Sequence, residues 1–149
     1  MNVTAPSRTI SAAQKVEHFD VLIVGAGISG IGSAYHLTRQ LPDISFVILE
    51  EQETFGGTWW THRYPGIRSD SDLHTFGYRF KPWRGVPIAT AQEILDYMGE
   101  VIEENELARH IRYRHRILNA SWSSKDKVWT IESRREDTGE ACRFTAGFL

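Results

Sequence analysis

Hydrophobic residues in the first third of the chain form two short continuous runs, separated by a stretch with helical spacing. The runs are Phe19–Val24 and Ser45–Glu50, and each is typical of a buried strand in a parallel sheet. Between them, apolar residues recur on one helix face as far as Leu41, and Pro42 follows: Ile28, Ile31, Ala34, Tyr35, Leu41. Two strands joined by one helix predict a right-handed βαβ unit.

The middle of the chain, from Gln52 to Pro87, has no sustained period and is rich in Gly, Pro, Arg and aromatic residues. It is predicted to be an ordered loop region, and a loop of this length inside a compact domain usually serves a function. Thr90 and Glu93 then match a capping box that opens an amphipathic helix. Its core face is expected to contain Ile94, Leu95, Met98, Val101, Ile102 and Leu107.

The last third of the chain is predicted to form β-strands. Ile111–Leu118 predicts a third strand, and Trp122–Ile131 predicts a hairpin that turns at Ser124–Lys127, with Trp122 and Trp129 packed across it. A second turn is expected at Glu136–Gly139, before an apolar stretch from Phe144 to Leu149. Together these elements predict an α/β, Rossmann-like domain over residues 19–149, a parallel sheet with helices plus a β-meander. Residues 1–18 are expected to form a disordered N-terminal tail.

Composition narrows the function classes. The chain has 149 residues, enough for one domain, and its 41% hydrophobic and 24% charged residues are ordinary for a globular protein. A net charge of −2 gives no reason to expect nucleic acid, and the basic residues at 109–116 follow an acidic stretch at 100–106 and are interpreted as solvated. Cys142 is the only cysteine, so a disulfide framework is excluded and a cytoplasmic location is expected. No apolar run is long enough to span a membrane, and His62 and His74 lack metal-ligand spacing, so no metal is assigned.

A glycine-rich turn follows the first predicted strand: Gly25-Ala26-Gly27-Ile28-Ser29-Gly30. The pattern is weak evidence alone, but here a strand leads in, a helix leads out, and Glu50 ends the second strand about 20 residues later. The glycines permit a tight turn and close approach of a pyrophosphate, and the helix N-terminus attracts its charge. Glu50 is expected to accept hydrogen bonds from a ribose and to repel a 2′-phosphate, which favours FAD or NAD over NADP at this site.

Two further motifs bring a resemblance to a known family. Gly56-Gly57-Thr58-Trp59 is similar to the second glycine motif of two-dinucleotide flavoproteins, and the block from Arg63 to Trp83 is more specific still. Together they resemble class B flavin-dependent monooxygenases of the Baeyer–Villiger type, from Phe19 to the end of the chain. The resemblance implies an FAD-binding Rossmann domain, a second domain for NADPH, and O2 as co-substrate. It also implies that a peroxyflavin oxidises a small-molecule ketone, sulfur or nitrogen centre.

The resemblance also assigns individual residues. Gly57, Thr58 and Trp59 join the first glycine turn in the expected FAD site, although Trp59 also suits a packing role. Asp70 matches the family aspartate that pairs with an arginine near the flavin, where positive charge stabilises the peroxyflavin anion. Without the resemblance, Asp70 would be interpreted as a loop residue that caps a turn. For Asp72, a turn and a place in the site stay equally open.

Parts of the family pattern are absent from the sequence, namely the class B fingerprint, a second GxGxxG and the arginine partner of Asp70. The chain is therefore expected to be an N-terminal fragment that lacks the NADPH-binding domain. We also expect it to lack a strand from the middle of its sheet and to be inactive alone. Two alternatives stay open: an FAD-dependent reductase or oxidase without peroxyflavin chemistry, and a non-catalytic nucleotide-binding remnant. An NAD-dependent dehydrogenase would leave the Arg63–Trp83 block unexplained.

Overall fold

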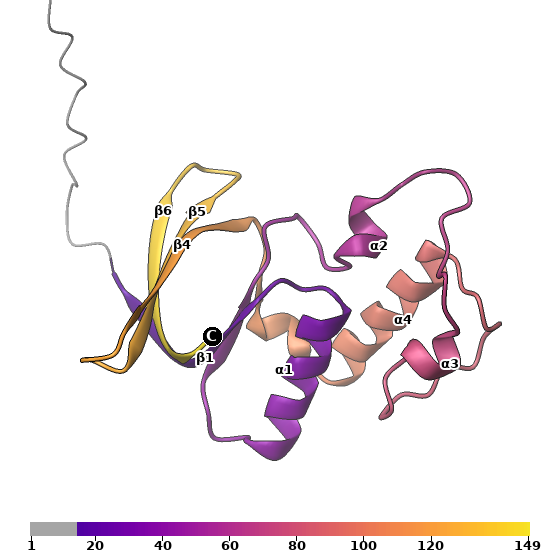
Figure 1. Ribbon diagram of the computed structural model, residues 1–149, viewed down its shortest axis with the longest axis horizontal. Helices are drawn as coiled ribbons and strands as arrows, with labels where there is room; N and C mark the ends of the chain where they lie inside the picture. Colours follow the sequence, from indigo (N-terminus) through magenta and orange to yellow (C-terminus); the bar gives the residue numbers. More distant parts are fainter. Residues whose placement is uncertain (1–14) are drawn as a thin grey trace, which may run out of the picture.

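A six-stranded sheet, in the order β3-β2-β1-β6-β5-β4, organises the chain in a computed structural model that describes residues 15–149. The helices gather beside the parallel strands and away from the antiparallel strands β4 to β6 (Figure 1). The elements are β1 (Glu17–Val24), α1 (Ile28–Gln40), β2 (Phe46–Leu49), α2 (Thr58–Thr61), α3 (Leu73–Phe76), α4 (Ala91–Glu104), the 3-10 helix η1 (Leu107–His110), β3 (Ile111–Arg112), β4 (His115–Ser123), β5 (Val128–Arg135) and β6 (Ala141–Phe148).

The parallel half contains the predicted βαβ unit, which is confirmed. β1 and β2 pair in parallel from Val21 opposite Phe46 to Val24 opposite Leu49, and α1 crosses between them. All four residues of β2 are buried, as expected for a strand covered on both faces. The carboxyl ends of β1 and β2 therefore lie side by side at the edge of the sheet where the glycine-rich turn begins.

The antiparallel half is the predicted meander. β4, β5 and β6 pair in succession, with turns at the two expected positions. Trp122 lies opposite Trp129 across the first hairpin, with ring centroids 5.5 Å apart, and Gly139 supplies the positive φ of 73° in the second turn. The Rossmann-like fold with a β-meander is thus confirmed.

One strand over Ile111–Leu118 was a wrong prediction. The segment is divided: β3 pairs with β2, and β4 begins at His115 and enters the meander. The chain reverses at Arg114, which takes a left-handed φ of 60° and donates its amide to the carbonyl of Gln52 at 2.9 Å. Because arginine rarely adopts this backbone region, the sequence carries no turn signal there.

The apolar stretch predicted from Phe144 to Leu149 belongs to β6, in the middle of the described sheet, and the expected absence of a further strand stays a prediction. β6 lies between β1 and β5, with Phe144 opposite Glu17 and Phe148 opposite Val21. This parallel pairing draws the start of β1 into the sheet, so β1 begins at Glu17 rather than Phe19, and the predicted tail of residues 1–18 overlaps it. Arg112 holds Glu17 through two hydrogen bonds of 2.7 Å. Residues 1–14 of the predicted tail lie outside the described residues.

Helix α4 begins with the predicted capping box. The Glu93 amide donates to Thr90 Oγ1 at 3.3 Å, and the Thr90 amide donates to Glu93 Oε2 at 2.8 Å. Of the expected core face, Leu95 is half-buried and the other α4 residues are buried: Ile94, Met98, Val101, Ile102. Leu107 is buried as well, but it belongs to η1, because α4 ends at Glu104.

The region from Gln52 to Pro87 is ordered, as predicted, and contains the short helices α2 and α3. It is tied to the start of α4, where the Ser69 amide donates to the Ala89 carbonyl at 2.8 Å and Ser69 Oγ accepts from the Ala89 amide at 3.1 Å. Within residues 15–149, no helix is long and apolar enough to cross a membrane.

Candidate functional site

The first glycine motif forms the turn between β1 and α1. Gly25 has a φ of 90°, and its amide donates to the carbonyl of Leu49 at 2.8 Å, which joins the turn to the end of β2. A Cβ on Gly30 would lie 2.0 Å from the carbonyl oxygen of Gly25, so no side chain fits there. Gly30 therefore allows α1 to start directly beside the strand, with its first amides free of intrahelical partners.

The second glycine motif folds directly onto the first. The Gly56 amide donates to the Ala26 carbonyl at 3.0 Å. A Cβ on Gly57, which has a φ of 54°, would lie only 3.1 Å from the Cα of Gly27. At Gly27 and Gly57 the two motifs thus meet backbone to backbone, so no side chain of these two residues keeps a phosphate group away.

Glu50 stands at the end of β2 with only 5% of its surface exposed. Its Oε2 accepts from the Ala26 amide at 2.7 Å, and its Oε1 accepts from the Gln52 amide at 2.8 Å. Each carboxylate oxygen can accept a further bond, so the group is fixed in place and still able to receive hydroxyl donors. Burial, together with the nearby Glu50 charge, raises the pKa of Tyr113.

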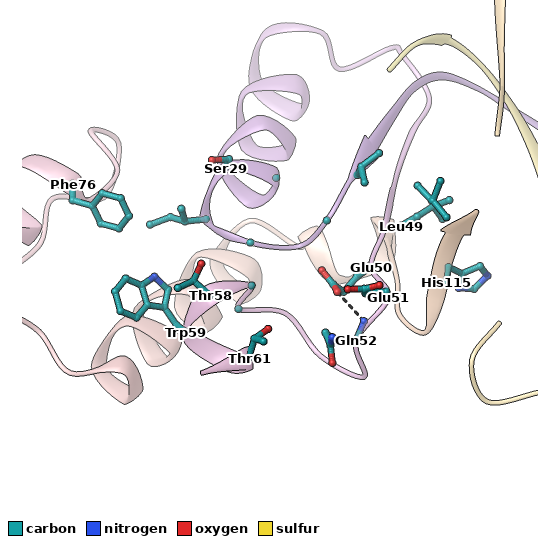
Figure 2. A pocket seen from close by; sticks show the side chains of 18 residues that line it. Ser29, Leu49, Glu50, Glu51, Gln52, Thr58, Trp59, Thr61, Phe76 and His115 are labelled. Carbon is teal, nitrogen blue, oxygen red and sulfur yellow. Dashed lines mark hydrogen bonds between the residues drawn. The ribbon is translucent and has the colours of Figure 1, made fainter. Parts of the chain in front are cut away.

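A cavity of about 620 Å³ opens along both motifs. Figure 2 shows Glu50 and Gln52 toward one end, Trp59 and Phe76 toward the other, and the glycine turn between them. The cavity is lined by nearly all the site residues that the sequence predicts: Gly25, Gly27, Ile28, Ser29, Gly30, Glu50, Gly57, Thr58, Trp59. A polar end, a glycine-rich centre and an aromatic end follow one another, which suits a ligand with a ribose, phosphates and a ring system.

Other lining residues were not predicted from the sequence: Val24, Leu49, Glu51, Gln52, Gly56, Thr61, Phe76, His115, Ile117. His115 and Ile117 come from β4, which reaches the cavity because the His115 amide donates to the Glu50 carbonyl at 2.8 Å. That contact joins segments that are far apart in the sequence, so no local motif predicts it. Gly56 lies in the second glycine motif and Phe76 in the Arg63–Trp83 block, so the sequence alone could have predicted both as site residues.

Asp70 is not among the residues that line this cavity, and it is exposed. Asp72 caps α3, where its side chain accepts from the His74 amide at 2.7 Å, so it has the turn role that the sequence left open. No group of three or more His, Cys, Asp or Glu side chains in the described range 15–149 could hold a metal ion.

Comparisons with known proteins agree with this geometry. The family described as NAD(P)-binding Rossmann-like domain matches residues 23–85. The FAD-containing monooxygenase EthA of Mycolicibacterium smegmatis is 52% identical over 134 residues, which cover 89% of this chain and 27% of that protein. The chain thus spans about a quarter of the length of this relative.

Solved structures of monooxygenases are similar to this chain as well. A steroid monooxygenase bound to NADP has a TM-score of 0.74 and 32% identity over 87% of this chain and 25% of its own. Cyclohexanone monooxygenase, in its closed form, has a TM-score of 0.76 and 26% identity over 89% of this chain and 25% of its own. The chain is therefore related, in sequence and in fold, to FAD-containing monooxygenases of the Baeyer–Villiger type, as its motifs predict.

Proposed function

We propose that this chain supplies the binding site for the ADP half of FAD in a flavin-dependent monooxygenase. The observation that carries the proposal is the contact between the two glycine motifs beside the fixed carboxylate of Glu50. A Cβ on Gly57 would intrude on this surface, 3.1 Å from the Gly27 Cα, so the residues present fit a closely bound pyrophosphate.

Each part of the cavity has a role in this proposal. The first-turn amides of α1 bind the pyrophosphate, because they lack intrahelical acceptors and carry the positive end of the helix dipole. Glu50 accepts from the adenosine ribose, and the nearby carboxylate of Glu51 adds negative charge that disfavours a 2′-phosphate. Trp59 and Phe76 border the flavin end and exclude water there.

When bound, FAD supplies two-electron oxidation and reduction and, once reduced, reactivity toward oxygen. For the whole enzyme we propose NADPH and O2 as co-substrates and a small molecule with a ketone, sulfur or nitrogen centre as the substrate. Asp70 would act as the partner of an arginine outside this chain, and the NADPH site would also lie outside it. The 149 residues alone are expected to turn over no substrate. The cytoplasmic location expected from the single cysteine stays a prediction.

Titration of the purified chain with FAD, followed by flavin fluorescence, tests the proposal. In the variant Gly27→Ala, the new Cβ would lie 3.7 Å from its nearest neighbour, the Gly57 Cα, and the φ of −78° suits alanine. The variant should fold, yet its methyl group covers the phosphate surface, so its affinity for FAD should fall at least about tenfold, or 1.4 kcal/mol.

Gly99→Ala, on α4 and outside the cavity, is the matched control and should bind FAD like the parent. Equal affinity of Gly27→Ala and the parent would contradict the proposed site. ADP bound as tightly as FAD would favour the nucleotide-binding remnant, because the flavin end would then contribute nothing. NADPH-dependent oxygen uptake by the chain alone would contradict its expected inactivity.

A further inference from the structure

An aromatic stack joins the block from Phe76 to Trp83 to helix α1. Phe80 lies against Tyr35 of α1 with ring centroids 3.5 Å apart, and Tyr78 lies against Phe80 at 4.7 Å. Neither Tyr78 nor Phe80 lines the cavity described above. The proposed cofactor site therefore leaves unexplained why this part of the block is packed so closely on the phosphate-binding helix.

Tyr78 is held at both its backbone and its hydroxyl. Its amide donates to the hydroxyl of Tyr97 at 2.7 Å, and that hydroxyl donates to the carbonyl of Lys81 at 2.6 Å. The Tyr78 hydroxyl donates to the carbonyl of Ile28. Ile28 is the first residue of α1 and lines the cavity, so the hydroxyl reaches the helix turn that faces the cavity.

Gly32 makes the approach of the Tyr78 ring possible. A Cβ at Gly32 would lie 2.9 Å from Cε1 of Tyr78, closer than real Cβ contacts. Burial raises the pKa of the Tyr78 phenol, and the neighbouring Tyr97 raises it further, while a hydrogen bond from the Gly32 backbone partly opposes the shift. The hydroxyl therefore keeps its proton, and remains a donor to the Ile28 carbonyl, throughout the neutral pH range.

We propose that Tyr78 is a positioning residue for the cofactor site: by donating to the Ile28 carbonyl with its ring against Gly32, it sets the orientation of the first turn of α1. The amides of that turn have no intrahelical acceptors, so a small rotation would change how they meet a pyrophosphate. The identity of the ligand rests on the proposed function. The orientation of the turn is a property of the chain without ligand.

The test compares Tyr78→Phe with Tyr35→Phe. The first removes the hydroxyl and keeps the ring. The second removes a hydroxyl from the same stack that has no hydrogen-bond partner among the residues described. In the FAD-free chain, Tyr78→Phe should displace the ¹H–¹⁵N amide resonances of residues 28–31, and Tyr35→Phe should not. With FAD, Tyr78→Phe should shift the two ³¹P resonances of the pyrophosphate and raise Kd about 3- to 10-fold, the loss expected for one hydrogen bond.

Gly32→Ala provides a second variant, because its Cβ pushes the Tyr78 ring out of position although the hydroxyl group is retained. It should shift the same ³¹P resonances and weaken FAD binding, and it decides the matter if Tyr78→Phe does not fold. Unmoved amide and ³¹P resonances, with only a lower free energy of unfolding, would show that Tyr78 merely packs and would overturn the inference. If the parent binds no FAD, the proposed function fails, while the amide resonances of the FAD-free chain still decide whether Tyr78 orients the turn.

Discussion

Replacing Glu50 by glutamine is expected to destabilise the chain even without a cofactor. The carboxylate accepts backbone amides at both oxygens, at 2.7 and 2.8 Å, in a site where only 5% of the residue is exposed. The glutamine amide has one acceptor oxygen, so its NH2 group must face one of the two donors. One charge-assisted bond is lost and one buried N–H is orphaned, which together cost about 3 kcal/mol.

Urea unfolding followed by circular dichroism measures this cost. With an m value of about 2 kcal/mol per molar urea, the midpoint should fall by about 1.5 M. Glu51→Gln is the matched control, because the Glu51 side chain is next to Glu50 in sequence, is exposed, and makes no hydrogen bond within the described part of the chain. If Glu50→Gln unfolds at the midpoint of the parent, the carboxylate does not hold the two amides and the reasoning fails.

Two other variants test the turn and the start of the sheet. Gly30→Ala would place a Cβ 2.0 Å from a backbone carbonyl oxygen, so the variant should lose more than about 4 kcal/mol and show no native circular dichroism; a native spectrum would refute the steric argument. Arg112→Gln removes the partner of Glu17, whose pKa the hydrogen bond from Arg112 lowers below its usual 4.5. The lowered pKa of Glu17 stabilises the fold above pH 4.5, and this stability is lost as the pH falls through the pKa of the folded state. The difference in Tm between parent and variant should therefore be largest near pH 7 and shrink in acid. A difference in Tm that stays constant down to pH 3 would count against this ion pair.

Local signals account for what could be predicted from the sequence. The glycine turn, the capping box of Thr90 and Glu93 and the hairpin around Trp122 each depend on residues close together in the chain. In each of these segments the local preference agrees with the tertiary structure, and the predicted elements were confirmed.

Contacts between distant segments account for what was missed. His115 lines the cavity only because its amide bonds to the carbonyl of Glu50, and β4 starts there only because Arg114 takes a left-handed conformation. The packing of Tyr78 on Gly32 is of the same kind: neither residue carries a local sign of the other. Such contacts depend on the completed fold, so neither hydrophobic periodicity nor a local motif can predict them.

The pairing of β6 with β1 has a consequence for how the chain folds. His18 bonds to Thr145 across 127 positions of sequence, so joining the parallel and antiparallel halves closes a loop of nearly the whole chain. By chain statistics, a loop of that size costs about 4 kcal/mol of entropy beyond a constant. The hairpins of the meander and the βαβ unit close much shorter loops and are expected to form first. The kinetic barrier of this fold would then lie in the late arrival of β6 beside β1, and synthesis from the N-terminus would leave that edge of β1 open until β6 emerges.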